Sequence, residues 1–151
     1  MTSQEDYYVF YDTETTGLDI NFSQIIQVGC VLTDHDFNII EEVNLNSQVL
    51  PWIVPSPDAF LVHKQTNCLD SGLSHYEMMK TLRDKWLAWG KNKNLIFVSY
   101  NGHRFDEELV RRQFYWNLFD PYITNTNGNR RLDLMSLFQI IGNFFSDKVK
   151  V

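Results

Sequence analysis

The stretch YVFYDTETTGL, residues 8–18, places two acidic side chains two positions apart at the end of an apolar, aromatic run. Aromatic and β-branched residues in so short a run predict a buried strand over residues 7–12. Residues i and i+2 of a strand point to the same face, so Asp12 and Glu14 should lie side by side. Taken alone, the pair also fits carboxylates that simply face water at a strand end, because D-x-E pairs are common.

Composition indicates a globular protein, with 151 residues, 44% of them hydrophobic and 15% aromatic. No apolar run approaches the roughly 18 residues of a membrane span, and the polar N-terminus does not resemble a secretory signal. Cys30 and Cys68 lie far apart, which favours reduced thiols and a cytoplasmic protein. The net charge of −6 argues against coating nucleic acid by bulk electrostatics. It leaves room for a local site where metal cations supply the positive charge.

The remaining hydrophobic pattern predicts an α/β domain with a mixed sheet and helices packed on it. Ser74 and Glu77 fit a capping box, in which each side chain satisfies a free backbone N–H of the other, and Gly90 is suited to end that helix. Three prolines predict an irregular connection over residues 50–60. The expected elements after the first strand are a hairpin (25–46), a helix (from Ser74 to Gly90), a strand (95–100), a helix (105–118), a loop and a helix with a stripe of Leu134, Leu137, Phe138, Ile141 and Phe145.

A third acidic residue follows the second buried strand in the stretch SYNGHRFDEEL, residues 99–109, where Asp106 begins a helix. If the two strands are neighbours, Asp106 should meet Asp12 and Glu14 at one edge of the sheet. Three carboxylates gathered there would repel unless a cation neutralised them. Mg²⁺ and Mn²⁺ prefer such oxygen ligands. Asp106 is equally suited to the positive end of the helix dipole, and the two explanations are compatible.

These stretches resemble a known family. DTETTG, residues 12–17, is similar to the first motif of the DEDD-type 3′→5′ exonucleases, which have a ribonuclease-H-like fold. YNGHRFDEELVRRQFYWNLFDPY, residues 100–122, resembles the exonuclease I branch, whose members degrade single-stranded DNA. RRLDLMSLF, residues 130–138, also resembles that branch, with Asp133 opening a helix. The resemblance extends over most of residues 8–145.

The resemblance implies a metal-dependent exonuclease. Asp12, Glu14 and Asp106 would be the catalytic metal ligands, in an active site that holds two Mg²⁺ or Mn²⁺ ions when complete. The ions would clamp the attacking water and the leaving oxygen. The partner would be the 3′ end of single-stranded DNA, and the products nucleoside 5′-monophosphates.

The resemblance also implies residues beside the terminal nucleotide. Leu18 is then a wedge against the terminal base or a buried loop leucine, and His63 contacts the 3′ end or lies on the surface. Arg111 and Arg112 either contact phosphates or lie on the helix surface only for solubility. The candidate substrate-binding residues are Thr15, Thr16, Gly17, Leu18, His63, Asn101, Arg104 and Phe105.

One family motif is absent. The family carries a late histidine, the general base, with a fourth aspartate five residues on, and after Asp133 the only acidic residue is Asp147, with no histidine near it. We therefore expect residues 1–151 to be the N-terminal part of an exonuclease domain, truncated before its final motif and weakly active or inactive. The alternatives are an exoribonuclease of the same superfamily and a binding protein that has lost turnover.

Overall fold

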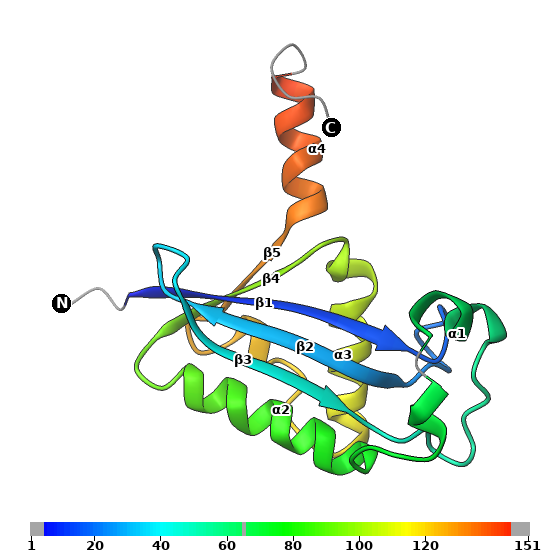
Figure 1. Cartoon of the computed structure of the whole chain (residues 1–151). Coiled ribbons are helices and arrows are strands. Elements are labelled where there is room, and N and C mark those ends of the chain that lie inside the picture. Colours follow the sequence, from blue (N-terminus) through cyan, green and yellow to red (C-terminus); the bar gives the residue numbers. More distant parts are fainter. Residues whose placement is uncertain (1–4, 65, 146–151) are drawn as a thin grey trace.

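The computed structural model describes residues 5–64 and 66–145 and contains one five-stranded mixed sheet (Figure 1). β1 is central, with β2 antiparallel to it on one side and β4 parallel to it on the other. β3 extends the sheet beyond β2, and β5 extends it beyond β4. The predicted strand, hairpin and mixed sheet are confirmed. The strands are β1 (Asp6–Thr15), β2 (Ile25–Thr33), β3 (Ile39–Asn46), β4 (Asn94–Ser99) and β5 (Arg130–Asp133).

Two of the α-helices, α2 and α3, pack against the sheet and contribute the α-helical part of the core. The longest, α2, begins at the predicted capping box, where Ser74 accepts from the Glu77 amide and the Glu77 carboxylate accepts from the Ser74 amide. It ends at Gly90, as expected. The α-helices are α1 (Pro57–His63), α2 (His75–Trp89), α3 (Asp106–Trp116) and α4 (Leu134–Phe144), and the short 3₁₀ turns are η1 (Thr66–Leu69), η2 (Gly102–Arg104) and η3 (Ile123–Asn125).

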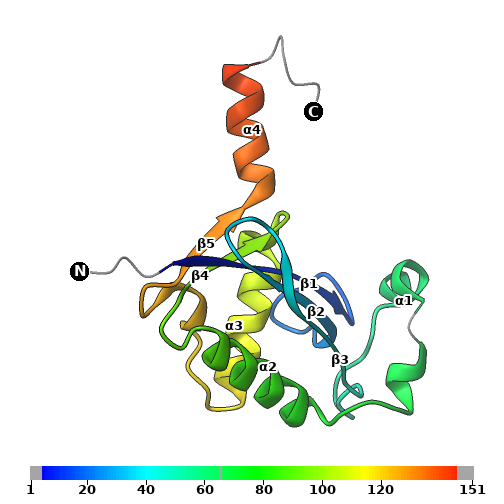
Figure 2. The ribbon, with the colours of Figure 1, turned by 60° about the vertical axis from the view of Figure 1, so that its left-hand side comes forward.

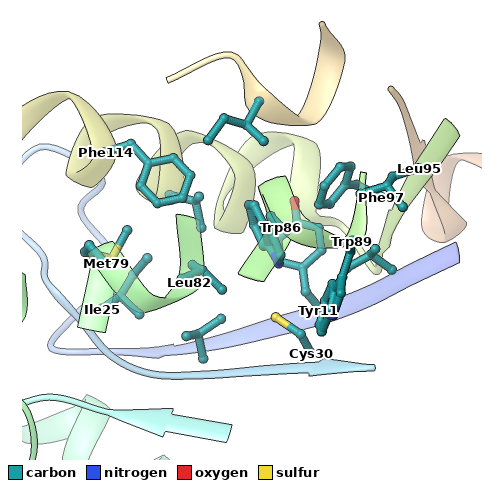
Figure 3. Close-up of a cluster of buried hydrophobic side chains, with 14 of the residues drawn as sticks. Tyr11, Ile25, Cys30, Met79, Leu82, Trp86, Trp89, Leu95, Phe97 and Phe114 are labelled. Carbon is teal, nitrogen blue, oxygen red and sulfur yellow. The ribbon is translucent and has the colours of Figure 1, made fainter. Parts of the chain in front are cut away.

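The core lies between one face of the sheet and the helices α2 and α3. Trp86 of α2 is fully buried and meets Tyr11, Phe97 and Phe114 edge-on, with ring centroids 5.6, 4.8 and 5.8 Å away (Figure 3). Offset and edge-on arrangements are the favoured geometry for aromatic pairs. Since Tyr11 faces this core, the alternation of β1 sends Asp12 to the opposite face. The same packing therefore positions the acidic pair.

Three elements differ from the sequence expectations. A short helix, α1, begins at Pro57 inside the segment expected to be irregular, because proline suits the first helical position. The strand β5 precedes the last helix and pairs in parallel with β4. The last helix forms as predicted but is not packed on the sheet: none of its residues is buried, and it projects from the body (Figure 2).

Two further expectations concern the membrane and the thiols. No helix within residues 5–64 and 66–145 is long and apolar enough to cross a membrane. Cys30 and Cys68 are both buried free thiols.

Candidate active site

The acidic pair lies at the carboxyl end of β1, on the sheet face opposite α2 and α3. Asp12 is exposed and Glu14 is half-buried, and the residues paired with them on β2 are Gly29 and Gln27. Neighbouring Thr13 points the other way and is buried. The i, i+2 spacing thus gives two adjacent carboxylates on one accessible face, as the sequence predicts.

Asp106 reaches this end of β1 because the neighbouring strand stops short. The pairing of β1 with β4 ends at Phe10, which leaves the last residues of β1 with a free edge on that side. Asp106 occupies this edge: its Oδ1 atom accepts from the Thr13 amide at 3.1 Å and from the Thr13 hydroxyl at 2.5 Å. Asp106 is therefore bound to Thr13, the residue between Asp12 and Glu14, and lies at the edge of the sheet where the sequence predicts it.

The electrostatics of Asp106 favour neutralisation of its charge. The side chain is buried, and this burial raises its pKa, with the negative charge of Asp12 adding to the rise. Hydrogen bonds from Thr13 oppose the rise only in part. A buried carboxylate beside a second one is a group whose charged form a cation would stabilise.

These residues match a hard divalent ion in donor chemistry, since all three offer carboxylate oxygens. Among residues 5–64 and 66–145, however, no three His, Cys, Asp or Glu side chains already converge as a ligand set. Asp106 is fixed by Thr13, whereas Asp12 is exposed and Glu14 is half-buried. A divalent ion at this edge would be held by the fixed Asp106 together with the accessible Asp12 and Glu14.

The turn before Asp106 is held by a residue far along the chain. Asp133, at the end of β5, accepts from the Asn101 amide at 2.9 Å through Oδ1 and from the His103 amide at 3.2 Å through Oδ2. Although burial alone would raise it, these amides and those of α4 hold the pKa of Asp133 below its usual range. Gly102 is required here, because a Cβ would lie 2.1 Å from the Ser99 hydroxyl oxygen. Asn101 takes a left-handed conformation in the same turn.

A pocket of about 280 Å³ opens directly beside Glu14. Its walls come from three parts of the chain, two of which are joined by a hydrogen bond of 2.7 Å from the Ser56 amide to the Thr16 carbonyl. Leu18 is 87% exposed at the pocket, so the alternative of a buried loop leucine is wrong. The lining residues are Thr13, Glu14, Thr15, Gly17, Leu18, Ser56, Asp58, Ala59, Val62 and Phe105.

Of the predicted substrate residues, Thr16, Asn101 and Arg104 are not among the described residues that line this pocket. Thr16 is buried, and its hydroxyl accepts from the Gln24 amide rather than facing solvent. Asn101 and Arg104 are exposed in the turn before Asp106 but do not line the pocket. The side chain of His63 lies outside the described residues, although its backbone belongs to α1.

Several residues of the site were not predicted. Glu107, next to Asp106, is fully buried and accepts from the hydroxyls of Tyr11 at 2.8 Å and Thr124 at 2.5 Å. Arg131 of β5 pairs with it at 3.1 Å. The triplet DEE, residues 106–108, contains both a candidate metal ligand at the free edge of β1 and a fully enclosed structural carboxylate, and only the tertiary contacts tell them apart.

Residues 9–149 match the family model for RNase_T, described as exonuclease. The chain belongs to this exonuclease family. The chain also resembles the exodeoxyribonuclease I of Haemophilus influenzae, with 33% identity over 134 residues. That alignment covers 86% of this chain but only 28% of the relative.

Two further comparisons bear on this exonuclease-family chain. Its fold matches a zinc-bound complex of E. coli ExoI with ssDNA, with a TM-score of 0.87, 22% identity, and coverage of 97% of this chain and 32% of that one. An oligoribonuclease from Francisella tularensis is 32% identical over 80 residues, which is 53% of this chain and 40% of that enzyme. The chain thus spans about three-tenths of the exonuclease I relatives, and the ribonuclease-H-like exonuclease fold is confirmed.

Proposed function

We propose that this domain, residues 1–151, is the nuclease unit of a metal-dependent 3′→5′ exonuclease that degrades single-stranded DNA to nucleoside 5′-monophosphates. The observation that carries the proposal is the position of Asp106 on the free edge of β1, bound to Thr13 between Asp12 and Glu14. The pocket lined in part by Thr13 and Glu14 would take the terminal nucleotide. The single-stranded DNA in the related E. coli complex supports this substrate class.

In this proposal Asp12, Glu14 and Asp106 hold Mg²⁺ or Mn²⁺. Such ions activate water and stabilise charge on the phosphate oxygens. The related E. coli complex is a zinc-bound form, which supports a divalent cation as the cofactor. Thr13 fixes the Asp106 carboxylate through two hydrogen bonds, so that one ligand is preorganised before an ion arrives.

The terminal base would occupy the pocket between Leu18 and Phe105. Leu18 offers an exposed apolar side chain that a base can cover. Phe105, which lies far from Leu18 in the sequence, offers an aromatic ring that lines the same pocket. Because both side chains are apolar, they would grip the base without selecting among bases. Asp58 of α1 also lines the pocket and would face the sugar, whose hydroxyl can donate to a carboxylate.

The proposed mechanism also needs a general base that takes a proton from the attacking water, and the histidines are the candidates for it. His35 lies on the exposed tip of the β2–β3 hairpin, paired with Asp36, and His75 is buried at the start of α2. Among the histidines whose side chains the structure describes, only His103 lies in the turn next to Asp106, and it is exposed. General-base catalysis contributes about 10²–10⁴-fold, so we expect residues 1–151 alone to turn over very slowly.

The competing activity is hydrolysis of RNA, which the similarity to an oligoribonuclease favours over half of the chain. Discrimination would depend on contacts to the 2′-hydroxyl. A non-catalytic nucleic-acid-binding role is the remaining alternative, and it predicts binding without any digestion.

The test uses 5′-labelled single strands of DNA and RNA with Mn²⁺, each with a free or a blocked 3′ end. We expect slow shortening of DNA from the free 3′ end, lost in Asp106→Asn, with Asp36→Asn on the distant hairpin as the matched control. Faster shortening of RNA would reverse the assignment of substrate. Digestion that survives in Asp106→Asn would refute the site, and binding without digestion would leave the non-catalytic role. Cytoplasmic fractionation of the native protein would test the proposed compartment.

A further inference from the structure

A second pocket lies at the far end of α3 from the candidate active site. It measures about 430 Å³ and is lined by Leu50, Trp52, His75, Tyr76, Trp116 and Asn117. Its aromatic side chains are accessible: Trp52 is 73% exposed, Tyr76 51% and Trp116 43%. Exposed rings of this size around one hollow are unusual on a protein surface unless they bind something.

One of the residues that line this pocket, His75, has polar atoms without hydrogen-bond partners. His75 is only 6% exposed, and neither of its ring nitrogens has a hydrogen-bond partner. Burial lowers the pKa of this imidazole to about 4, so the ring is neutral at pH 7, with one donor and one acceptor nitrogen. The Trp116 ring lies beside it, tilted by 57°, with ring centroids 6.5 Å apart. If the exposed Trp116 ring moved aside, a ligand with both donors and acceptors on one edge could reach His75.

The helix α3 connects this pocket to the active site. Phe105 is the N-cap residue of α3, and Arg112 and Trp116 follow on the helix four residues apart, which places these two on one face. Phe105 lines the pocket beside Glu14, and Trp116 lines the aromatic pocket. At a helical rise of 1.5 Å per residue, Phe105 and Trp116, at the two ends of α3, are about 16 Å apart along the helix axis.

A cation without a partner lies between the two pockets. Arg111 is paired with Glu108 at 2.9 Å, but none of the ion pairs within residues 5–64 and 66–145 includes Arg112. The Arg112 Nε atom is buried without a hydrogen-bond partner. Guanidinium groups bind phosphate oxygens strongly, so this position suits a phosphate that passes from one pocket to the other.

We propose that the pocket of Trp52, His75, Tyr76 and Trp116 is an accessory base-binding site, which holds an upstream base of the DNA strand whose 3′ end occupies the active site. This inference rests on the proposed function. Stacking on aromatic rings is how proteins bind single strands without sequence preference. A stacked strand advances about 3.4 Å per nucleotide, so the bound base is between about the third and the sixth from the 3′ end.

The experiment measures binding of the whole chain to a 12-mer of deoxythymidine and to the dinucleotide, with Ca²⁺ as the divalent ion and gels to verify intact DNA. A series of 12-mers then carries one abasic residue at each of the first eight positions from the 3′ end. Wild type should lose about 5- to 100-fold in affinity when the abasic residue falls at one internal position.

Trp116→Ala should bind the intact 12-mer about 5- to 100-fold more weakly, lose this position dependence, and bind the dinucleotide like wild type. Tyr115→Ala is the matched control, because Tyr115 is the adjacent residue of α3, is 69% exposed and does not line the pocket. Trp52→Ala, from the opposite wall, repeats the test independently of α3. Circular dichroism verifies the fold of each variant.

Equal binding of the 12-mer by wild type and both tryptophan variants would overturn the accessory site, as would the absence of any sensitive internal position. The pocket would then serve another class of ligand, such as a protein segment. Normal dinucleotide binding in that case would leave the proposed nuclease function standing. Failure of wild type to bind either DNA would overturn both.

Discussion

The buried, unpartnered His75 should make the stability of this protein sensitive to pH in a way that one substitution removes. The pKa of a free histidine is 6.5, and burial lowers that of His75 to about 4. Between these values the unfolded chain binds a proton that the folded chain does not. Stability is therefore lost as the pH falls through 6.5 toward 4.

The magnitude follows from linkage. Going from pH 7.5 to pH 5.0, this one group should remove about 2 kcal/mol from the free energy of unfolding. In a domain of about 150 residues, that corresponds to a decrease of about 4–8 °C in melting temperature. His75→Phe keeps a ring of similar size and has no group to titrate. It should also be more stable at pH 7.5, because no buried nitrogen is left unsatisfied.

The assay is urea denaturation of wild type and His75→Phe at pH 7.5 and 5.0. The stability difference in favour of the variant should widen by about 2 kcal/mol at the lower pH. His35→Gln is the control, because His35 lies exposed on the β2–β3 hairpin, and this variant should follow wild type. Parallel pH profiles for wild type and His75→Phe would refute the burial argument. His75→Leu separates loss of titration from strain caused by the larger phenylalanine ring.

Three further predictions concern the acidic site and its supports. Asp106→Asn should raise the melting temperature without metal, because the raised pKa of Asp106 means that its charge destabilises the fold at neutral pH, and it should abolish most of the stabilisation by Mn²⁺ in thermal shift assays. Arg131→Ala should cost about 3–5 kcal/mol in urea denaturation because it leaves buried Glu107 without its cation, whereas loss of the exposed pair in Arg130→Ala should cost about 1 kcal/mol or less. Leu18→Ala should weaken dinucleotide binding about tenfold or more in calorimetry while the melting temperature stays nearly constant, since the side chain is 87% exposed.

Local patterns predicted the elements whose signals lie within a few residues. The aromatic run before Asp12 gave a buried strand, and the Ser74–Glu77 pair gave the start of α2. The same reasoning brought Asp106 to the correct edge of the sheet, because it required only that two buried strands be neighbours.

Features that depend on tertiary partners were not predictable. β5 has only four residues, two of them arginines, and becomes a strand because β4 offers it hydrogen bonds. The stripe of α4 shows that this helix has an apolar face, but a stripe does not specify what the face packs against. The role of Thr13 depends on where β4 stops, and the enclosure of Glu107 depends on Tyr11, Thr124 and Arg131.

The tether from Asp133 to the turn before Asp106 has a consequence for biosynthesis. All three acidic residues have left the ribosome's catalytic centre once residue 106 has been joined, yet the amides of Asn101 and His103 are held only after residue 133 has been added. Domains begin to fold from the N-terminus during synthesis. A growing chain would therefore carry all three acidic residues for some time before the turn that precedes Asp106 is anchored, and that anchor would form only when β5 pairs with β4.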